Sequence, residues 1–247
     1  MQVQNNPAGR LHDILSAARQ HPPKEPARKV WASIFDITPE DTGTLLKMLA
    51  DLIDLVHETK AAIQKLDDVD QNLHLKPFKR IESALSTFNL DASWEHWKNQ
   101  IDDSTLLGLQ FSADKLSRLS GTTSIPNDEL ANLRSQLDAL IGFVAESSLV
   151  PEIKIFMLRH LERLRHALLA YRVRGLDGLQ EGLETIVGSF MLNSEAVKSS
   201  ATTEEEKEAM KKIFNLIDQF NKVVSFARNA KELASPAIQL LTQLIGP

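Results

Sequence analysis

The sequence contains no cysteine, which excludes disulfide frameworks, thiolate nucleophiles, Cys-based zinc sites and iron–sulfur clusters. Glycine is scarce, at 10 of 247 residues, and one tyrosine stands beside ten phenylalanines. Globular proteins average about 7% glycine, so turn-rich all-β architectures and glycine-rich nucleotide folds are disfavoured. The chain is 43% hydrophobic, which is enough to form a folded core. We therefore expect a folded protein made of helices.

Long apolar runs are also missing. No window reaches about 18 uninterrupted apolar residues, which excludes a constitutive transmembrane helix. Residues 1–20 lack an apolar stretch of signal-peptide length, so we expect a cytoplasmic location. The P-loop, dinucleotide-binding, nucleophile-elbow and zincin signatures are absent, and no cofactor is expected.

Charge alternates in bands along the chain, although its formal total is only −5. Residues 38–74 and 176–208 are acidic, whereas residues 151–175 and 209–247 are basic. Such bands are typical of helices that pair with one another or with a partner. The acidic total argues against specific binding of duplex nucleic acid.

Apolar residues recur at separations of three and four in the strongest helical pattern of the chain. They are Leu45, Leu49, Leu52, Val56, Thr59, Ile63 and Leu66. Thr38-Pro39-Glu40-Asp41 has the cap, proline and acidic residues of a helix start, so the pattern predicts a helix from Pro39 to about Asp70. Additional apolar residues flank this stripe, which favours the core of a bundle over a two-stranded coiled coil.

The same spacing predicts further helices. Their apolar stripes run over 130–144 after an Asn127 cap, over 176–190, and over 210–227 after Thr203 and three glutamates. Shorter helices are expected at about 8–20, 26–35, 76–89, 92–101, 104–120, 151–174 and 236–246. No alternating strand pattern occurs, so the expected fold is all-α, a bundle of long antiparallel amphipathic helices with shorter helices packed across them.

One domain over 1–247 is the expected organisation. Gly121 and Pro126 bracket the best candidate boundary, which gives an alternative division into 1–121 and 127–247 with a loop at 122–126. Residues 193–203, rich in serine and threonine, form a second candidate boundary. Either stretch is also compatible with a loop inside one bundle.

A basic face on the helix expected at 151–174 is the first candidate site. Arg159, Arg163, His166 and Arg174 gather on a side different from the apolar stripe. Arginine forks bind carboxylates and phosphates, so this face is a candidate surface for an acidic partner. The alternative is pairing with the acidic helices of the same chain.

Trp94 and Trp97 share a helix face and form the second candidate surface. Exposed tryptophans would anchor a partner, whereas buried ones would belong to the core.

Asp54, His57 and Glu58 form a weak candidate metal site on one helix. A metal-binding bundle needs ligands that point into the core, and these three lie away from the apolar stripe of their helix. Glu162 and His166, four residues apart, are a second weak pair with a simple stabilising interpretation.

Interior glycines make residues 176–192 unusual. Gly178 and Gly182 match a close-packing motif, which in a soluble bundle indicates close approach of a neighbouring helix. The alternative is a membrane contact, shared with Leu241 and Leu244 of an apolar C-terminal segment that we otherwise expect to dock as a closing helix.

A non-catalytic role follows as the first functional hypothesis, since catalytic signatures are missing and amphipathic faces are abundant. The chain is expected to be an interaction or assembly subunit, regulatory or structural, of a larger complex, with an acidic protein or a second copy of itself as partner. A membrane-inserting helical protein is the first alternative, and an enzyme with a helical metal site at Asp54, His57 and Glu58 is the second.

Overall fold

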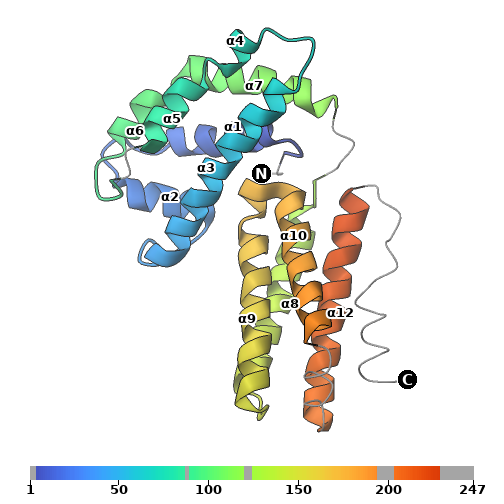
Figure 1. Ribbon diagram of the computed structural model, residues 1–247. Helices are drawn as coiled ribbons and strands as arrows, with labels where there is room; N and C mark the ends of the chain where they lie inside the picture. The colour runs from blue at the N-terminus through green and yellow to red at the C-terminus, as the bar shows by residue number, and fades with distance from the viewer. Residues whose placement is uncertain (1–3, 87–88, 120–123, 194–202, 229–247) are drawn as a thin grey trace. The chain divides into compact units, whose positions relative to one another are not determined.

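The computed structural model describes residues 4–86, 89–119, 124–193 and 203–228. These residues contain helices and no β-strand, apart from an isolated bridge between Pro26 and Ser93 (Figure 1). The prediction of an all-α fold is confirmed. The expected closing helix at 236–246 lies outside the described residues, as do most of residues 193–203.

Two compact units make up the described chain. The N-terminal unit holds residues 4–119 together with Arg172–Gly175, and the C-terminal unit holds the rest. Residues 172–175 belong to the N-terminal unit, although the residues before and after them belong to the C-terminal unit. The alternative division of the chain at 122–126 did not include this exchange. The organisation as one domain stays a prediction.

The N-terminal unit is built from seven helices among the described residues. They are α1 (Pro7–Arg19), α2 (Ala27–Phe35), α3 (Thr42–Gln64), α4 (Gln71–Leu75), α5 (Phe78–Ser86), α6 (Glu95–Gln100) and α7 (Asp103–Ser117). Helix α1 is central, since it packs against α2, α3 and α7. Its residues Leu11, Ile14 and Leu15 are fully or almost fully buried, which places the core of this unit around α1.

Helix α3 carries the strongest apolar stripe of the sequence, and all seven predicted positions, from Leu45 to Leu66, are buried. The predicted ends were wrong. The helix begins after Asp41, whose side chain accepts a hydrogen bond from the Thr44 amide at 3.0 Å and so takes the capping role expected of Thr38. It ends at Gln64, and the side-chain amide of Gln71 donates to the carbonyls of Ile63 and Leu66 at 3.1 and 3.0 Å.

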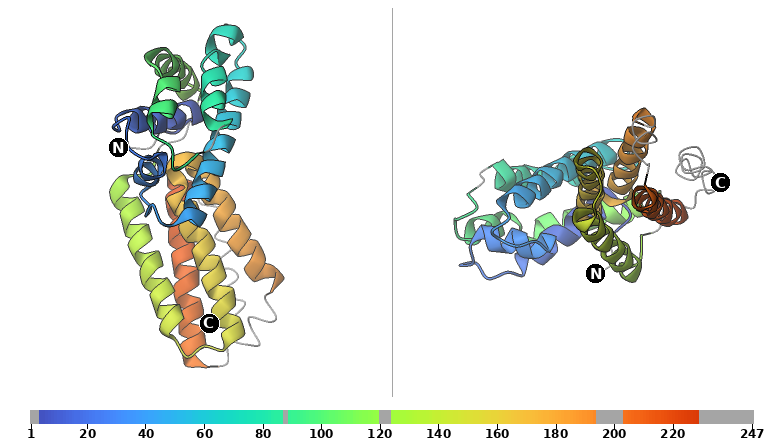
Figure 2. Two further views of the ribbon diagram at one scale, coloured as in Figure 1. Left: turned by 90° about the vertical axis from the view of Figure 1, so that its left-hand side faces the viewer. Right: turned by 90° about the horizontal axis from the view of Figure 1, so that it is seen from below.

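The C-terminal unit contains α8 (Asn127–Glu146), α9 (Pro151–Leu169), α10 (Tyr171–Leu192) and α12 (Glu204–Ala227). Figure 2 shows these helices side by side, and α8 contacts both α9 and α12. The start of α12 was predicted correctly: Thr203 and Glu206 form a reciprocal capping box, with bonds of 2.8 and 3.2 Å. Asn127 was predicted as the cap of α8 but is its first helical residue, after Pro126.

Helix α9 is shorter than expected, because it ends at Leu169 and not at residue 174. Ala170 follows as its C-terminal cap, and α10 begins at Tyr171. The backbone then leaves helical geometry at Gly175, which adopts φ 62° and ψ −154°. The basic residues expected on one helix are therefore divided between the two units, with Arg172 and Arg174 in the N-terminal one.

Candidate functional site

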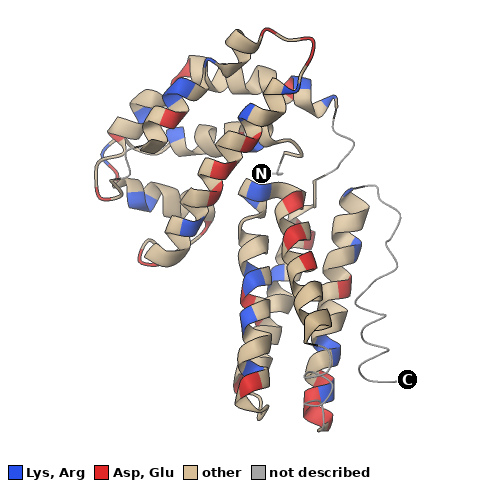
Figure 3. Ribbon diagram, viewed as in Figure 1, with Lys and Arg blue, Asp and Glu red and all other residues tan. Residues whose placement is uncertain are grey.

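An exposed stripe on α9 is the feature that stands out in the C-terminal unit. Ile155, Arg159 and Arg163 lie four residues apart, so they follow one another along a single face of the helix. Both arginines are exposed, and the Ile155 side chain is 57% exposed. We call these three residues the α9 stripe. Figure 3 shows basic residues along α9 and acidic residues on the neighbouring α10.

Other basic groups of α9 are already engaged inside the chain. Arg165 pairs with Asp138 of α8 at 3.1 Å and with Glu162 at 3.6 Å, and Lys154 donates to the carbonyl of Ala145 at 2.9 Å. Across the described part of the chain, by contrast, no acidic side chain comes within ion-pair distance of Arg159 or Arg163. Intramolecular pairing, the alternative considered from the sequence, thus accounts for Arg165 and leaves these two guanidinium groups available.

The candidates His166 and Arg174 do not extend the stripe. His166 is half-buried in the last turn of α9 and is engaged in an interaction there. Arg174 lies in the N-terminal unit, where its Nε atom is 3.8 Å from the Asp51 carboxylate of α3. The prediction that Arg174 shares one helix face with Arg159 and Arg163 was wrong, because α9 ends five residues before it.

His160 is buried on a different side of α9 from the stripe. Its ring is 4.5 Å from that of Phe156 and 5.7 Å from that of Phe190, and only 4% of the residue is exposed. Burial lowers the pKa of His160, and the positive charges of Arg163 and Arg159 lower it further. His160 is therefore a neutral core residue at neutral pH, and it is not part of the exposed basic surface.

Trp94 and Trp97 are buried, with exposed fractions of 0% and 1%, so of the two alternatives the core holds, and their candidacy as a partner surface was wrong. Their rings stack on each other at 5.8 Å, and Trp31 meets both edge-on at 5.3 and 5.5 Å. The three indoles form a core cluster of the N-terminal unit. Trp31 lies more than sixty residues away in the sequence, and local spacing gave no signal that it would join the pair.

Arg10 is a buried, hydrogen-bonded arginine that no sequence pattern singled out. Only 5% of it is exposed, its Nε atom donates to the Val173 carbonyl at 2.9 Å, and its Nη2 atom donates to both Glu58 oxygens at 3.0 and 3.1 Å. Arg172 likewise donates to the Ile34 carbonyl at 2.8 Å. Arginines thus hold the segment 172–175 against the helices of the N-terminal unit, which is a structural role.

The proposed metal ligands Asp54, His57 and Glu58 are exposed, as their position off the apolar stripe predicted. Glu58 is also committed to Arg10. Within the ranges that the structure describes, no three His, Asp or Glu side chains are arranged to hold a metal ion. Glu162 lies next to Arg165, and the two form the i,i+3 ion pair described above.

Gly182 permits the close approach of two helices that the sequence indicated. A Cβ atom added there would lie 2.8 Å from the Cβ of Ala167, so α10 and α9 are in tight contact at this point. Gly178 is buried. Leu241 and Leu244 lie outside the described residues. Within the described ranges, none of the helices combines the length and the apolar character that a membrane span requires.

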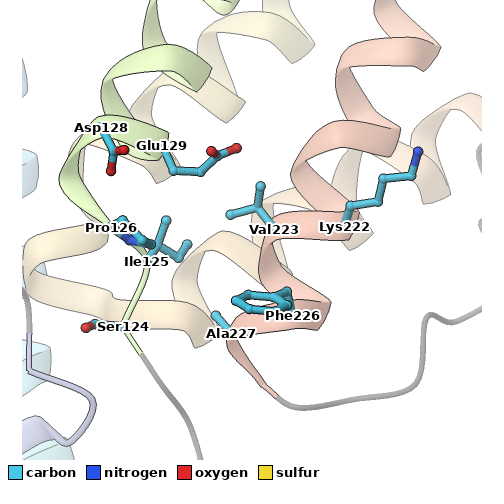
Figure 4. Close-up of a pocket in the computed structure, with 9 residues that line it drawn as sticks. All are labelled: Ser124, Ile125, Pro126, Asp128, Glu129, Lys222, Val223, Phe226 and Ala227. Carbon is cyan, nitrogen blue, oxygen red and sulfur yellow. The ribbon is translucent and has the colours of Figure 1, made fainter.

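A pocket of about 300 Å³ opens at the N-terminal end of α8, next to the end of α12 (Figure 4). Its lining residues are Ser124, Ile125, Pro126, Asp128, Glu129, Lys222, Val223, Phe226 and Ala227. Val223 and Phe226 point from α12 toward Ile125 and the start of α8. Phe226 is 79% exposed, which is unusual for so large an apolar side chain, and the pocket therefore has an open apolar wall.

The rim of this pocket is acidic on the α8 side. Asp128 and Glu129 lie in the first turn of α8, where the helix dipole favours carboxylates. Neither has an ion-pair partner in the described parts of the chain, whereas Lys222 on the other side is paired with Asp218 at 2.8 Å. Local spacing gives no signal of this pocket, because it forms where α8 meets α12, a helix about 95 residues later in the chain.

No protein-family model, curated protein or solved structure matches this sequence.

Proposed function

We propose that the chain is a non-catalytic interaction protein that binds an acidic partner through the α9 stripe. The observation that carries the proposal is the pair of exposed arginines, Arg159 and Arg163, whose charges no described side chain neutralises. A guanidinium group presents several donors in a fixed fork and so favours carboxylates.

Ile155 adds an apolar contact one turn before the arginines. An exposed isoleucine beside two cations fits a partner that offers an apolar side chain flanked by acids, and protein interfaces commonly combine such contacts. A nucleic-acid partner is disfavoured by the net charge of −5 and by the burial of the one tyrosine, since nucleic-acid surfaces combine basic charge with exposed stacking groups. As part of this proposal we place the protein in the cytoplasm.

Affinity capture with matched variants tests the proposal. The variant Arg159→Glu/Arg163→Glu reverses the two charges, and Lys24→Glu/Lys29→Glu makes the same change in net charge at exposed sites of the N-terminal unit. We expect the first variant to lose acidic proteins that the wild-type chain captures from lysate of the source organism, by about tenfold or more, and the control variant to retain them. Equal recovery by both variants would contradict the proposal.

Arg159→Lys/Arg163→Lys separates charge from fork geometry. This variant keeps both positive charges but removes the planar guanidinium groups, so we expect an intermediate loss if carboxylates are bound through paired hydrogen bonds.

A further inference from the structure

The α9 stripe and the pocket at the α8–α12 end are complementary in chemistry. The stripe offers an exposed Ile155 and two cations, whereas the pocket offers an open apolar wall with two carboxylates, Asp128 and Glu129, at its rim; none of these four charges is paired with another described residue. The half-buried Val223 and the exposed Phe226 ring provide apolar surface of the kind that an isoleucine side chain would cover, and the buried Ile125 lies beneath them.

One chain cannot bring its own stripe to its own pocket. Helix α8 has 20 residues, which corresponds to about 30 Å, and the pocket lies at its first turn. Ile155 lies in the second turn of α9, just after the short connection from the far end of α8. Ile155 is thus separated from the pocket by roughly 20 Å along the helices, so only the Ile155 of a second molecule can enter it.

We infer that the acidic partner of the α9 stripe is the α8–α12 pocket of a second copy of this chain. The inference rests on the proposed function and names its partner. Ile155 of one copy enters the pocket of the other, while Arg159 and Arg163 pair with Asp128 and Glu129. Each copy carries one stripe and one pocket, so each can supply either side of the contact.

Sedimentation velocity on the full chain tests the inference through complementary charge reversal. One variant carries Arg159→Glu/Arg163→Glu, and the other carries Asp128→Lys/Glu129→Lys. Each variant alone places like charges against each other, so we expect self-association to weaken by about tenfold or more relative to wild type. In the mixture every stripe faces a rim of opposite charge, and association returns to near the wild-type level.

The milder variant Asp128→Asn/Glu129→Gln guards against loss of folding, since lysines at a helix start oppose the dipole. It should weaken association without changing the helical signal in circular dichroism.

A wild-type chain that remains monomeric from low to high micromolar concentration would overturn the inference, and so would reversed variants that associate as well as wild type. The variant Phe226→Asp distinguishes a second copy of the chain from a segment of the same chain as the occupant of the pocket. If it lowers the melting temperature of the full chain and leaves sedimentation unchanged, the residues that follow Phe226 cover the pocket and the inference fails. In each of these cases, continued loss of captured acidic proteins by Arg159→Glu/Arg163→Glu would leave the proposed function intact.

Discussion

Replacement of Gly175 by alanine should strongly destabilise the N-terminal unit. Gly175 combines φ 62° with ψ −154°, a backbone conformation that is almost restricted to glycine. A Cβ atom there would lie 2.7 Å from Nη1 and 2.9 Å from Cζ of Arg10. The Arg10 side chain cannot move aside freely, because it is buried and bonded to Val173 and Glu58.

The magnitude follows from two terms. A non-glycine residue in this backbone region costs about 1–3 kcal/mol. Displacement of the Arg10 guanidinium breaks its hydrogen bond to the Val173 carbonyl, and a bond of this charged kind is worth about 1.5–3 kcal/mol. The contact with Glu58 is left out, since that carboxylate is 44% exposed and well solvated. The two terms together give an expected loss of about 2.5–6 kcal/mol, a large part of the stability of a typical domain.

Urea denaturation followed by circular dichroism measures this loss, with Gly188→Ala in the same helix as control. A Cβ at Gly188 meets nothing within 4 Å, so the control should stabilise the protein by about 0.5–1 kcal/mol. In an Arg10→Met background the cost of Gly175→Ala should fall to the backbone term alone, because the clash is gone. A Gly175→Ala protein within 0.5 kcal/mol of wild type, on the order of ordinary surface changes, would refute the reasoning.

Three further predictions concern the C-terminal unit. His160→Phe should reduce the loss of stability between pH 7 and pH 5. Because its pKa is lowered in the folded protein, His160 stays neutral there, whereas the unfolded chain binds a proton at this residue as the pH falls below about 6.5. The free energy of unfolding of the wild-type protein therefore falls by up to about 1.4 kcal/mol per pH unit. Urea midpoints of both proteins across this range check it, and equal pH dependence would contradict it. Thr203→Ala removes one bond of the capping box and should cost about 1 kcal/mol in the same assay, whereas an unchanged midpoint would show that the cap contributes nothing. Gly182→Ala should lower the free energy of unfolding by about 1–3 kcal/mol, because the added Cβ meets Ala167. Gly142→Ala, with open space around it, should raise that free energy by about 0.5–1 kcal/mol. A Gly182→Ala protein that melts at a higher temperature than Gly142→Ala would contradict this expectation.

Helical segments with regular apolar spacing could be predicted from the sequence. The stripes of α3 and α12 are buried as expected, because amphipathic spacing of three and four selects both the helix and its inward face. Helix ends were harder to predict. At α3 both Thr38 and Asp41 could act as caps, and only the folded backbone decides in favour of Asp41.

The break after α9 was missed because its cause is not local. Residues 151–174 contain good helix formers and no internal proline, and Gly175 is the single nearby signal. The segment 172–175 is held by Arg10 and by the Ile34 carbonyl, groups more than 130 residues earlier in the chain. Periodicity within a window of 20 residues does not contain this information.

The candidate site was predicted in part. Arg159 and Arg163 are exposed on the side of α9 opposite its core, which the helical wheel indicated. The burial of Trp94 and Trp97 depends on Trp31, and the pocket depends on the meeting of α8 and α12. Both are long-range contacts, so spacing within one helix could not reveal them.

Arginine-selective modification by phenylglyoxal, read by mass spectrometry, shows whether a bound partner covers Arg159 and Arg163. The bound state is the self-associated chain at high concentration or its complex with a captured acidic protein, and the reference is the dilute chain alone. The account predicts protection of Arg159 and Arg163 in the bound state and no protection of Arg118, which is 71% exposed in the N-terminal unit. Unchanged modification of Arg159 and Arg163 in a sample shown to be bound would contradict it.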